Sequence, residues 1–517
     1  MNIFNYLMNK KEHEIFKNDD ILSYLLKKGQ VLTASGTEIN IKNAKGFEEL
    51  TLSKLSTQDG TPTPDNPVEV NTVKGYRNLF DVATWVQKGN NSNYYSYTNN
   101  TLSINTLDTR SLQDFTETEK IYLPNGTYYL SNIGNAGIRI YNTNENSPVL
   151  TNQFTVTLGY IYLKLVSSSV ITCNPMITEG TTQLHYVPYG TNWIYIKNIG
   201  KNLFDINGDV NTRYDGQTST NNTVSGNDLT TITNGGSTHL YGQKIYVGTG
   251  NTVSLSVKLK SITYTTEPSE NSTVAYMSLY NDNTTTGQLS SGLKYNEVGI
   301  RKTITFIAQT DYIYAAFGRA SLSKSATFTD IQVEIGSATS YEPYQKTIIL
   351  IPLNDNEICG IGDYKDEVII DKLGNAKLVK KIGKVVLDGS ESWVYQSTYN
   401  LINTNQFAYT HAIEPKNAND GLSNYFKLTT GWSKLTTVDE DMFQIYTDGA
   451  IYIRMNNTLA SDLTTFKAWL STHNTDVYYP LATPTEIDLG TVDMELYEGT
   501  NNITNSEDMD MVLKYYK

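Results

Sequence analysis

Residues 253–259 read Val-Ser-Leu-Ser-Val-Lys-Leu, an unbroken alternation of apolar and polar side chains. Successive side chains of a β-strand point to opposite faces of a sheet, so this alternation predicts a strand with one buried face. That face carries Val253, Leu255, Val257 and Leu259. Similar short runs lie at residues 304–306, 312–317 and 328–335. Short strands joined by Asn-, Gly- and Ser-rich connections, without a helical pattern, predict a two-sheet antiparallel sandwich.

The two ends of this region carry phrases that occur twice in the chain. Asn202-Leu-Phe-Asp205 repeats Asn78-Leu-Phe-Asp81. The closing phrases are Glu179, Tyr186, Pro188 and Tyr189 in the first copy, and Glu334, Tyr341, Pro343 and Tyr344 in the second. The offsets from the glutamate to each later residue are the same in both copies. The sequence therefore predicts a repeat, module 1 (residues 78–190) and module 2 (residues 202–345).

The shared residues of the repeat are expected to be structural. We expect each Asn-Leu-Phe phrase to clamp the entry of its module, the two glutamates to lie at equivalent positions of the last strand, and the later tyrosines to pack over the sandwich end. The predicted signature residues are Asn78, Phe80, Glu179, Tyr186, Asn202, Phe204, Glu334 and Tyr341. A ligand-binding role for the two glutamates is the alternative.

Composition supports a mainly β protein and excludes several functions. Tyr is abundant, with 38 residues against 14 Phe and 5 Trp, and Tyr, Thr, Val and Ile favour strands. The net charge is −13, and no Lys/Arg cluster suited to nucleic acid occurs. No apolar run has the length of a membrane span and no secretory leader is evident, so we expect neither membrane insertion nor secretion by that route. The 2 cysteines are expected to be buried hydrophobes rather than a disulfide framework.

Residues 1–29 have a helical pattern. Apolar residues recur at three-to-four spacing, and Lys27-Lys28-Gly29 is a typical helix end. Two short amphipathic helices cannot bury their apolar faces alone, so they need a partner. The partner is the protein's own body, a copy of the chain or another protein. The residues predicted to make this attachment are Leu7, Phe16, Leu22 and Leu25.

The remaining segments are a stiff spacer and a third β-rich region. Residues 56–67 read STQDGTPTPDNP, and this Pro-rich phrase predicts an extended, semi-rigid rod. Within the third region, residues 463–470 predict one short helix. The expected division is 1–29 (helical anchor), 30–77 (β-hairpin and spacer), 78–190 (module 1), 191–345 (the domain of module 2) and 346–517 (C-terminal β-rich domain).

Several phrases resemble proteins of phage particles. The spacer followed by Asn78-Leu-Phe-Asp81 resembles a block in minor tail and tail-fibre-like proteins of phages that infect low-GC Gram-positive bacteria. IQVEIGSATSYEPY (residues 331–344) resembles the last strand of jelly-roll modules grouped with carbohydrate-binding modules. Residues 381–393 and 479–490 resemble the C-terminal part of such phage proteins.

The resemblance implies a virion structural protein made of jelly-roll modules and released from the host cytoplasm by lysis. We expect a tail-fibre or baseplate-associated protein that binds other virion proteins through its N-terminal helices and contributes to binding host cell-wall glycan. A homo-oligomer is expected, and analogy with fibres favours a trimer. One alternative is a purely structural head-fibre or collar-associated protein without glycan binding, and another is a glycan depolymerase.

No catalytic motif stands out in the sequence. The 5 histidines are scattered, and neither a phosphate-binding loop nor a nucleophile elbow occurs. We therefore expect no enzyme activity, cofactor or bound metal. Aromatic rings near amide side chains suit sugars, because the rings cover C–H surfaces while the amides bond hydroxyls. The candidate glycan-binding residues are Trp85, Tyr94, Tyr95, Tyr97 and Trp432, with sheet packing or subunit contact as the alternative.

Overall fold

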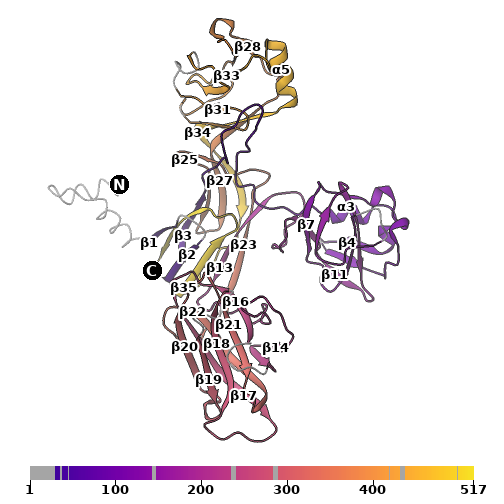
Figure 1. The fold of residues 1–517 in the computed structure, drawn as a ribbon, viewed down its shortest axis with the longest axis vertical. Helices are drawn as coiled ribbons and strands as arrows, with labels where there is room; N and C mark the ends of the chain where they lie inside the picture. The colour runs from indigo at the N-terminus through magenta and orange to yellow at the C-terminus, as the bar shows by residue number, and fades with distance from the viewer. Residues whose placement is uncertain are drawn as a thin grey trace, which may run out of the picture.

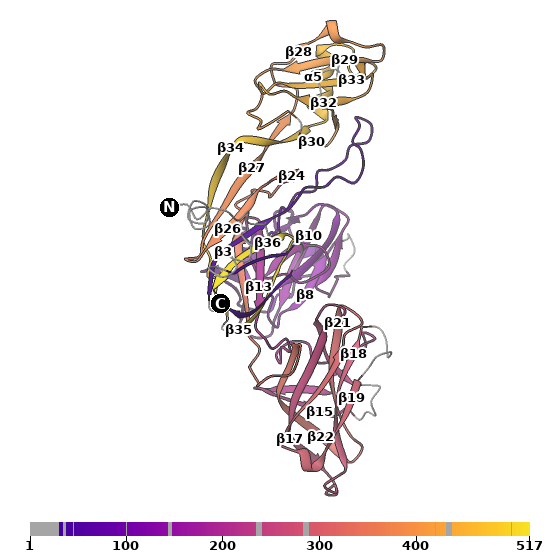
Figure 2. The same cartoon turned by 90° about the vertical axis from the view of Figure 1, so that its left-hand side faces the viewer.

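The computed structural model describes residues 30–34, 38–44, 46–99, 101–142, 147–233, 240–282, 289–418, 420–430, 437–497 and 499–516. The described chain is mainly β and almost all of its strand pairs are antiparallel, which confirms the predicted fold class at that level. The molecule is elongated, with a central body that carries three peripheral units (Figure 1 and Figure 2). The predicted helical anchor, residues 1–29 with Leu7, Phe16, Leu22 and Leu25, lies outside the described residues.

The central body, which we call the hub, consists of two sheets around one core. The first sheet has the order β1-β36-β3-β26-β27-β34-β30 and the second β2-β35-β13-β23. The strands are β1 (Gln30–Ala34), β2 (Glu38–Ala44), β3 (Gly46–Ser53), β13 (Trp193–Ile199), β23 (Lys346–Pro352), β26 (Glu367–Asp371), β27 (Asn375–Leu387), β30 (Leu422–Ser423), β34 (Thr475–Thr491), β35 (Gly499–Asn505) and β36 (Asp510–Tyr516). Alternating apolar residues of both sheets face inward and form the core, as the period of two requires.

The hub is assembled from segments that are far apart in the sequence. Leu32 pairs with Leu513, and Ile194 pairs with Ile351. This differs from the expected division, in which residues 30–77 and 346–517 were separate segments. Backbone hydrogen bonds in a ladder do not depend on sequence distance, so strands from both ends of the chain share one core.

Each peripheral unit is an insertion whose two ends lie side by side. Tyr76 and Trp193 exchange backbone hydrogen bonds of 2.8 and 2.7 Å at the base of module 1. The amide of Gly200 donates to Gln345 O at 3.0 Å at the base of module 2. The third unit lies between β27 and β34, which pair along their length. Because both ends of each insertion are held, each unit is joined to the hub by paired strands rather than by a single linker.

The strand order of module 1 recurs within module 2. Module 2 contains β14 (Asn222–Ser225), β15 (Asp228–Thr231), β16 (Tyr241–Tyr246), β17 (Thr252–Tyr264), β18 (Thr273–Asn281), β19 (Leu289–Lys294), β20 (Arg301–Ile307), β21 (Tyr312–Arg319) and β22 (Ser323–Ile335), with the 3₁₀ turn η4 (Tyr295–Glu297). Its sheets, β14-β15-β22-β17-β20 and β16-β21-β18-β19, enclose one apolar core. The predicted strand at residues 253–259 lies in β17, so that prediction is confirmed.

Module 1 contains β4 (Tyr95–Thr98), β5 (Thr101–Ile104), β6 (Ile121–Tyr122), β7 (Gly126–Ser131), β8 (Gly137–Tyr141), β9 (Gln153–Val156), β10 (Tyr160–Val166), β11 (Ile171–Cys173) and β12 (Met176–Glu179), with α3 (Val82–Val86), η1 (Asn91–Asn93), η2 (Leu112–Asp114) and η3 (Glu117–Glu119). Its sheets are β4-β5-β11, β12-β7-β9 and β6-β10-β8. Strands β11 and β12 together take the place of β22. With this correspondence, each pair of hydrogen-bonded strands in module 1 matches a pair of hydrogen-bonded strands in module 2.

The third peripheral unit, called the distal unit, comprises residues 388–474, of which β30 pairs with β34 at the end of the first hub sheet. It contains β28 (Val394–Tyr395), η5 (Ser397–Tyr399), β29 (Thr404–Tyr409), β31 (Lys427–Leu428), β32 (Met442–Ile445), β33 (Ile451–Asn456) and α5 (Leu463–Thr472). The predicted helix at residues 463–470 is confirmed by α5. Asp462 caps this helix by accepting a hydrogen bond from the Thr465 amide at 2.9 Å. Phe466 stacks on Phe407 of the sheet at a ring distance of 3.9 Å, which fixes the helix on the unit's core.

The Pro-rich spacer is a folded loop rather than an extended rod. Thr57 and Asn71 pair through their backbones, so the two ends of the loop meet. The amide of Val68 donates to Asn424 O at 2.8 Å, and Gln58 Nε2 donates to Ser423 O at 2.9 Å. Pro62 and Pro64 are buried. The loop therefore reaches from the hub to the base of the distal unit and braces that joint (Figure 2).

Candidate functional site

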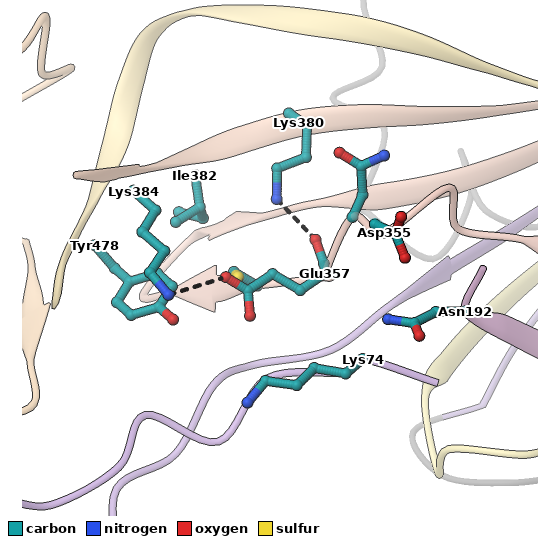
Figure 3. Close-up of a pocket in the computed structure, with 10 residues that line it drawn as sticks. Lys74, Asn192, Asp355, Glu357, Lys380, Ile382, Lys384 and Tyr478 are labelled. Atoms are coloured by element: carbon teal, nitrogen blue, oxygen red, sulfur yellow. Dashed lines mark hydrogen bonds and ion pairs between the residues drawn. The ribbon is translucent and has the colours of Figure 1, made fainter. Parts of the chain in front are cut away.

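A polar hollow lies where the segment that follows the spacer loop, the turn after β23 and the β27–β34 ribbon meet (Figure 3). Its volume is about 420 Å³, within the usual range of roughly 300–1,000 Å³ for ligand pockets. The lining residues are Lys74, Asn192, Asp355, Asn356, Glu357, Cys359, Lys380, Ile382, Lys384 and Tyr478. Lys74 and Asn192 lie on one side of the hollow, and Asp355 and Glu357 face them from the other.

One wall of the hollow is held by a buried carboxylate, Asp366. The pairing of β27 with β34 shifts between Lys380 and Ile382, which leaves backbone amides at this point without ladder partners. Asp366 accepts hydrogen bonds from the amides of Lys381 at 2.7 Å and Ile382 at 2.9 Å, and it is ion-paired with Lys380. It also accepts a bond from the amide of Cys359 at 2.9 Å. The wall is therefore rigid where it faces the hollow.

Most charged groups deep in the hollow are already paired. The Nζ atom of Lys384 lies 2.8 Å from Asp476 and 3.9 Å from Glu357. Burial disfavours the charge of Lys384, but hydrogen bonds to Asp476 and Tyr478 outweigh burial and raise its pKa. Glu357 accepts a hydrogen bond from Thr72 Oγ1 at 2.6 Å. These groups give the hollow polar atoms that can contact a ligand.

Cys359, which also lines the hollow, is not suited to nucleophilic chemistry. Its side chain is buried, and burial raises the pKa of the thiol to about 12. Because the thiolate is the reactive form, this cysteine is inert near neutral pH.

Two further hollows lie at the bases of the modules. One of about 530 Å³, at the base of module 1, is lined by Lys74, Gly75, Tyr76, Arg77, Leu79, Pro124, Tyr128, Thr178, Glu179 and Asn192. One of about 210 Å³, at the base of module 2, includes Glu38 and Lys197. Burial raises the pKa of Glu38 and lowers that of Lys197, and the charge of each partly offsets the effect on the other.

Two of the predicted glycan-binding residues are part of the core of module 1. Trp85 is 2% exposed and Tyr95 is 1% exposed, and their rings lie 4.8 Å apart. The hydroxyl of Tyr95 donates to Asp108 at 2.8 Å. Rings enclosed in this way offer no face to a sugar, so these residues have the packing role that the sequence left as the alternative.

The other candidates do not form an exposed platform either. The guanidinium of Arg110 covers one face of the Tyr94 ring at 4.6 Å. Tyr97 is half-buried against the core of module 1. Trp432 lies outside the described residues. Trp85, Tyr94, Tyr95 and Tyr97 therefore lie together in or against the core of module 1, and they form no exposed platform.

The entry phrases of the two modules make matching contacts. Asn78 Oδ1 accepts hydrogen bonds from the amides of Phe80 at 2.9 Å and Ile177 at 3.2 Å. Asn202 Oδ1 accepts the same bonds from Phe204 at 3.0 Å and Val333 at 3.1 Å. Phe80 and Phe204 are both 1% exposed. Tyr186 and Tyr341 are half-buried near the entry residues.

Glu179 and Glu334 are not equivalent, contrary to the expectation from their matching offsets. Gly180 and Gly336 donate corresponding bonds to Thr127 and Thr252. Glu334 lies two residues before Gly336, and the residue two before Gly180 is Thr178. Glu334 therefore corresponds to Thr178, and Glu179 lies one residue after the equivalent position. Because a shift of one residue turns a side chain to the other face of the sheet, Glu334 is buried and Glu179 is exposed. Glu334 accepts a bond from the amide of Thr339 at 2.9 Å, which is a structural contact.

Apart from Glu179, which the sequence singled out as a repeat residue with ligand binding as the alternative, the residues of the two hollows next to module 1 were not predicted. Lys74, Asn192, Asp355 and Lys384 belong to four separate segments, and no motif links them. The one local signal is the pair Asn354-Asp355, whose φ angles of +49° and +62° form a tight turn at the rim.

The described residues contain no group of three or more His, Cys, Asp and Glu side chains that could hold a metal ion. Within the same part of the chain, no helix has the length and hydropathy needed to cross a membrane. No protein-family model matches the sequence, and no curated protein is significantly similar to it.

Proposed function

We propose that this chain is a non-enzymatic structural protein of a phage particle, part of the tail fibre or baseplate, that displays β-modules toward the host envelope and contributes to glycan binding. The observation that carries the proposal is the joining of three peripheral units to one hub, each through paired ends (Figure 1). Such joints favour the fixed, outward display that a multivalent binding scaffold needs. The phage context comes from the resemblance of the sequence phrases.

We propose further that both modules are jelly rolls. Counted from β15, one sheet of module 2 contains the first, eighth, third and sixth strands, and the other contains the second, seventh, fourth and fifth. This alternation between two antiparallel sheets is the jelly-roll arrangement. The matching strand order of module 1 supports the same assignment for that module.

Residues 1–29 are proposed as the helical anchor that attaches the chain to other virion proteins, with Leu7, Phe16, Leu22 and Leu25 in the contact. We propose a homo-oligomer, with a trimer favoured by analogy with fibres, that is made in the host cytoplasm and reaches its final place in the virion. Removal of residues 1–28 tests this role. The truncated chain should keep its cooperative melting but fail to enter particles, and its assembly into virions would contradict the anchor.

The second candidate is a purely structural head-fibre or collar-associated protein that binds no glycan. It is favoured by the pairing of Lys380 with Asp366 and of Lys384 with Asp476, because these contacts make the main hollow part of the framework.

Co-sedimentation of the purified chain with host cell-wall polysaccharide separates the two candidates. The proposed function predicts retention that scales with polysaccharide concentration, whereas the structural alternative predicts none. Release of reducing ends from the same material would instead show a depolymerase and would contradict the absence of enzyme activity.

A further inference from the structure

The two hollows next to module 1 form one groove. Both are lined by Lys74 and Asn192, so these residues stand where the hollows meet. The groove thus runs from the β27–β34 ribbon, past the paired strands at Tyr76 and Trp193, to the last strand of module 1. It crosses the joint between the hub and module 1.

The groove holds polar side chains that the fold does not use. Among the described residues, the side chains of Arg77, Glu179, Asn192 and Asp355 make no hydrogen bond or ion pair. Three of these residues, Arg77, Glu179 and Asp355, are also exposed. This differs from Lys380 and Lys384 at the back of the groove, which are paired. The unused groups lie along both halves of the groove and are free to bond a ligand.

The walls also contain buried polar atoms without partners. Thr178, which lines the half next to module 1, is 1% exposed, and its Oγ1 has no hydrogen-bond partner within the described chain. Thr191 Oγ1 and Trp193 Nε1, in the half-buried residues on either side of Asn192, are also buried atoms without a hydrogen-bond partner in the described chain. Buried polar groups are nearly always satisfied, so unpaired atoms gathered at one joint indicate missing water or ligand groups.

The signs of the free charges indicate what kind of ligand fits. Arg77 is positive, whereas Asp355 and Glu179 are negative. A polyanion such as a phosphate polymer would be repelled by two unpaired carboxylates, and sites for such ligands cluster cations instead. A neutral polyhydroxylated chain can donate to the carboxylates and to Asn192 while accepting from Arg77, whereas Lys74 is ion-paired with Glu69 at 2.9 Å.

We propose that this groove binds a neutral oligosaccharide, held by hydrogen bonds to Asp355, Asn192, Arg77 and Glu179. The inference rests on the proposed function and names where the glycan contact is made. It assigns this contact to the joint between hub and module 1 rather than to the tyrosines of module 1.

The test uses the full chain on an array of immobilised neutral and acidic oligosaccharides, followed by calorimetric titration of the best neutral hexasaccharide. Asp355→Ala and Asn192→Ala should each weaken its binding by about tenfold or more, since each loss removes a bond worth about 1.4 kcal/mol or more. Asp363→Ala and Asn207→Ala are the matched controls, because these residues are exposed and lie outside the groove. The controls should bind like the parent chain.

Three outcomes would overturn the inference: no binding of any neutral oligosaccharide, preference for poly(glycerol phosphate), or neutral binding that the groove variants leave unchanged. If Asn192→Ala does not fold, Asp355→Ala decides alone, since the Asp355 side chain makes no hydrogen bond or ion pair within the described chain. If the parent chain and the groove variants are retained equally well on whole wall polysaccharide, the groove is not the binding site. The proposed function would then still stand. If the parent chain itself is not retained on the polysaccharide, the proposed glycan binding is wrong.

Discussion

The side-chain oxygen of Asn202 accepts a hydrogen bond from the backbone amide of Val333 at 3.1 Å, which ties the entry of module 2 to its last strand. The amide nitrogen of the same side chain donates to Ile331 O at 2.9 Å and to Glu342 O at 3.1 Å. Asn202 is 1% exposed, so these bonds are made away from water. Asn78 makes the matching tie to Ile177 in module 1. One buried side chain thus closes each module at its base.

Replacing this side chain is expected to weaken module 2. Asn202→Ala leaves buried backbone groups unpaired, and each such loss costs about 1–3 kcal/mol. We expect the free energy of unfolding of module 2 to fall by about 2–4 kcal/mol. Hydrogen exchange of β22 peptides, measured by mass spectrometry in the full chain, checks this. Asn207→Ala, at an exposed position of the same module, is the control, and equal exchange in both variants would contradict the role of the tie.

The buried ion cluster of module 1 predicts a larger effect. Arg110 lies 2.7 Å from Asp108, is ion-paired with Glu119, and has 5% of its side chain exposed against 0% for both carboxylates. Burial disfavours the charge of Arg110, but bonds to the two carboxylates outweigh it and raise the pKa of the guanidinium. Arg110→Ala leaves buried charges uncompensated and should cost module 1 about 3–5 kcal/mol.

The matched control for Arg110→Ala is Lys260→Ala in module 2. Lys260 is ion-paired with Asp228, and 55% of the Lys260 side chain is exposed. Exposed pairs contribute about 0–1 kcal/mol, so this variant should behave like the parent chain. Urea unfolding followed by exchange of module 1 and module 2 peptides measures both. A small loss in Arg110→Ala, comparable to the control, would show that the cluster is not a source of stability.

Both cysteines are expected to resist alkylation in the folded chain. Cys173 is 8% exposed and Cys359 is 2% exposed, and burial raises their pKa values from 9 to about 11 and about 12. The folded thiols hold their protons more tightly than the unfolded ones. Their contribution to stability is therefore complete below pH 9 and is lost as the pH rises through 11 to 12. Iodoacetamide at pH 8 should label neither residue until urea is added, and rapid native labelling at either would contradict this burial.

Replacing Gln58 is expected to weaken the contact between the spacer loop and the base of the distal unit. Gln58→Ala removes the bond to Ser423 O, which costs about 1 kcal/mol of local stability because the contact is partly exposed. Proteolysis within residues 59–67 should become faster while the melting of the distal unit changes little. Gln87→Ala, an exposed glutamine without side-chain contacts in the described chain, is the control. Unchanged cleavage rates in Gln58→Ala would indicate that other contacts hold the loop.

The local features of the fold could be predicted, and the candidate site could not. The strand β17 and the helix α5 both follow from the spacing of apolar residues, because that spacing is a local property of the chain. The hollow depends on Lys74, Asp355 and Lys384, which come together only after the hub forms. Trp85 shows that a single residue's environment could not be predicted either. The sequence shows an aromatic residue near Asn-rich segments, but it does not show that the ring faces the core.

The sequence by itself determined the strand faces, the repeat and the entry residues Asn78 and Asn202, since each is written in contiguous or regularly spaced residues. Only the tertiary structure decided that β1 pairs with β36, that β13 pairs with β23, and that each unit is therefore an insertion into one hub. The physical reason lies in the ladder itself. Every strand offers the same backbone donors and acceptors, so the choice of partner depends on which apolar faces meet in a common core.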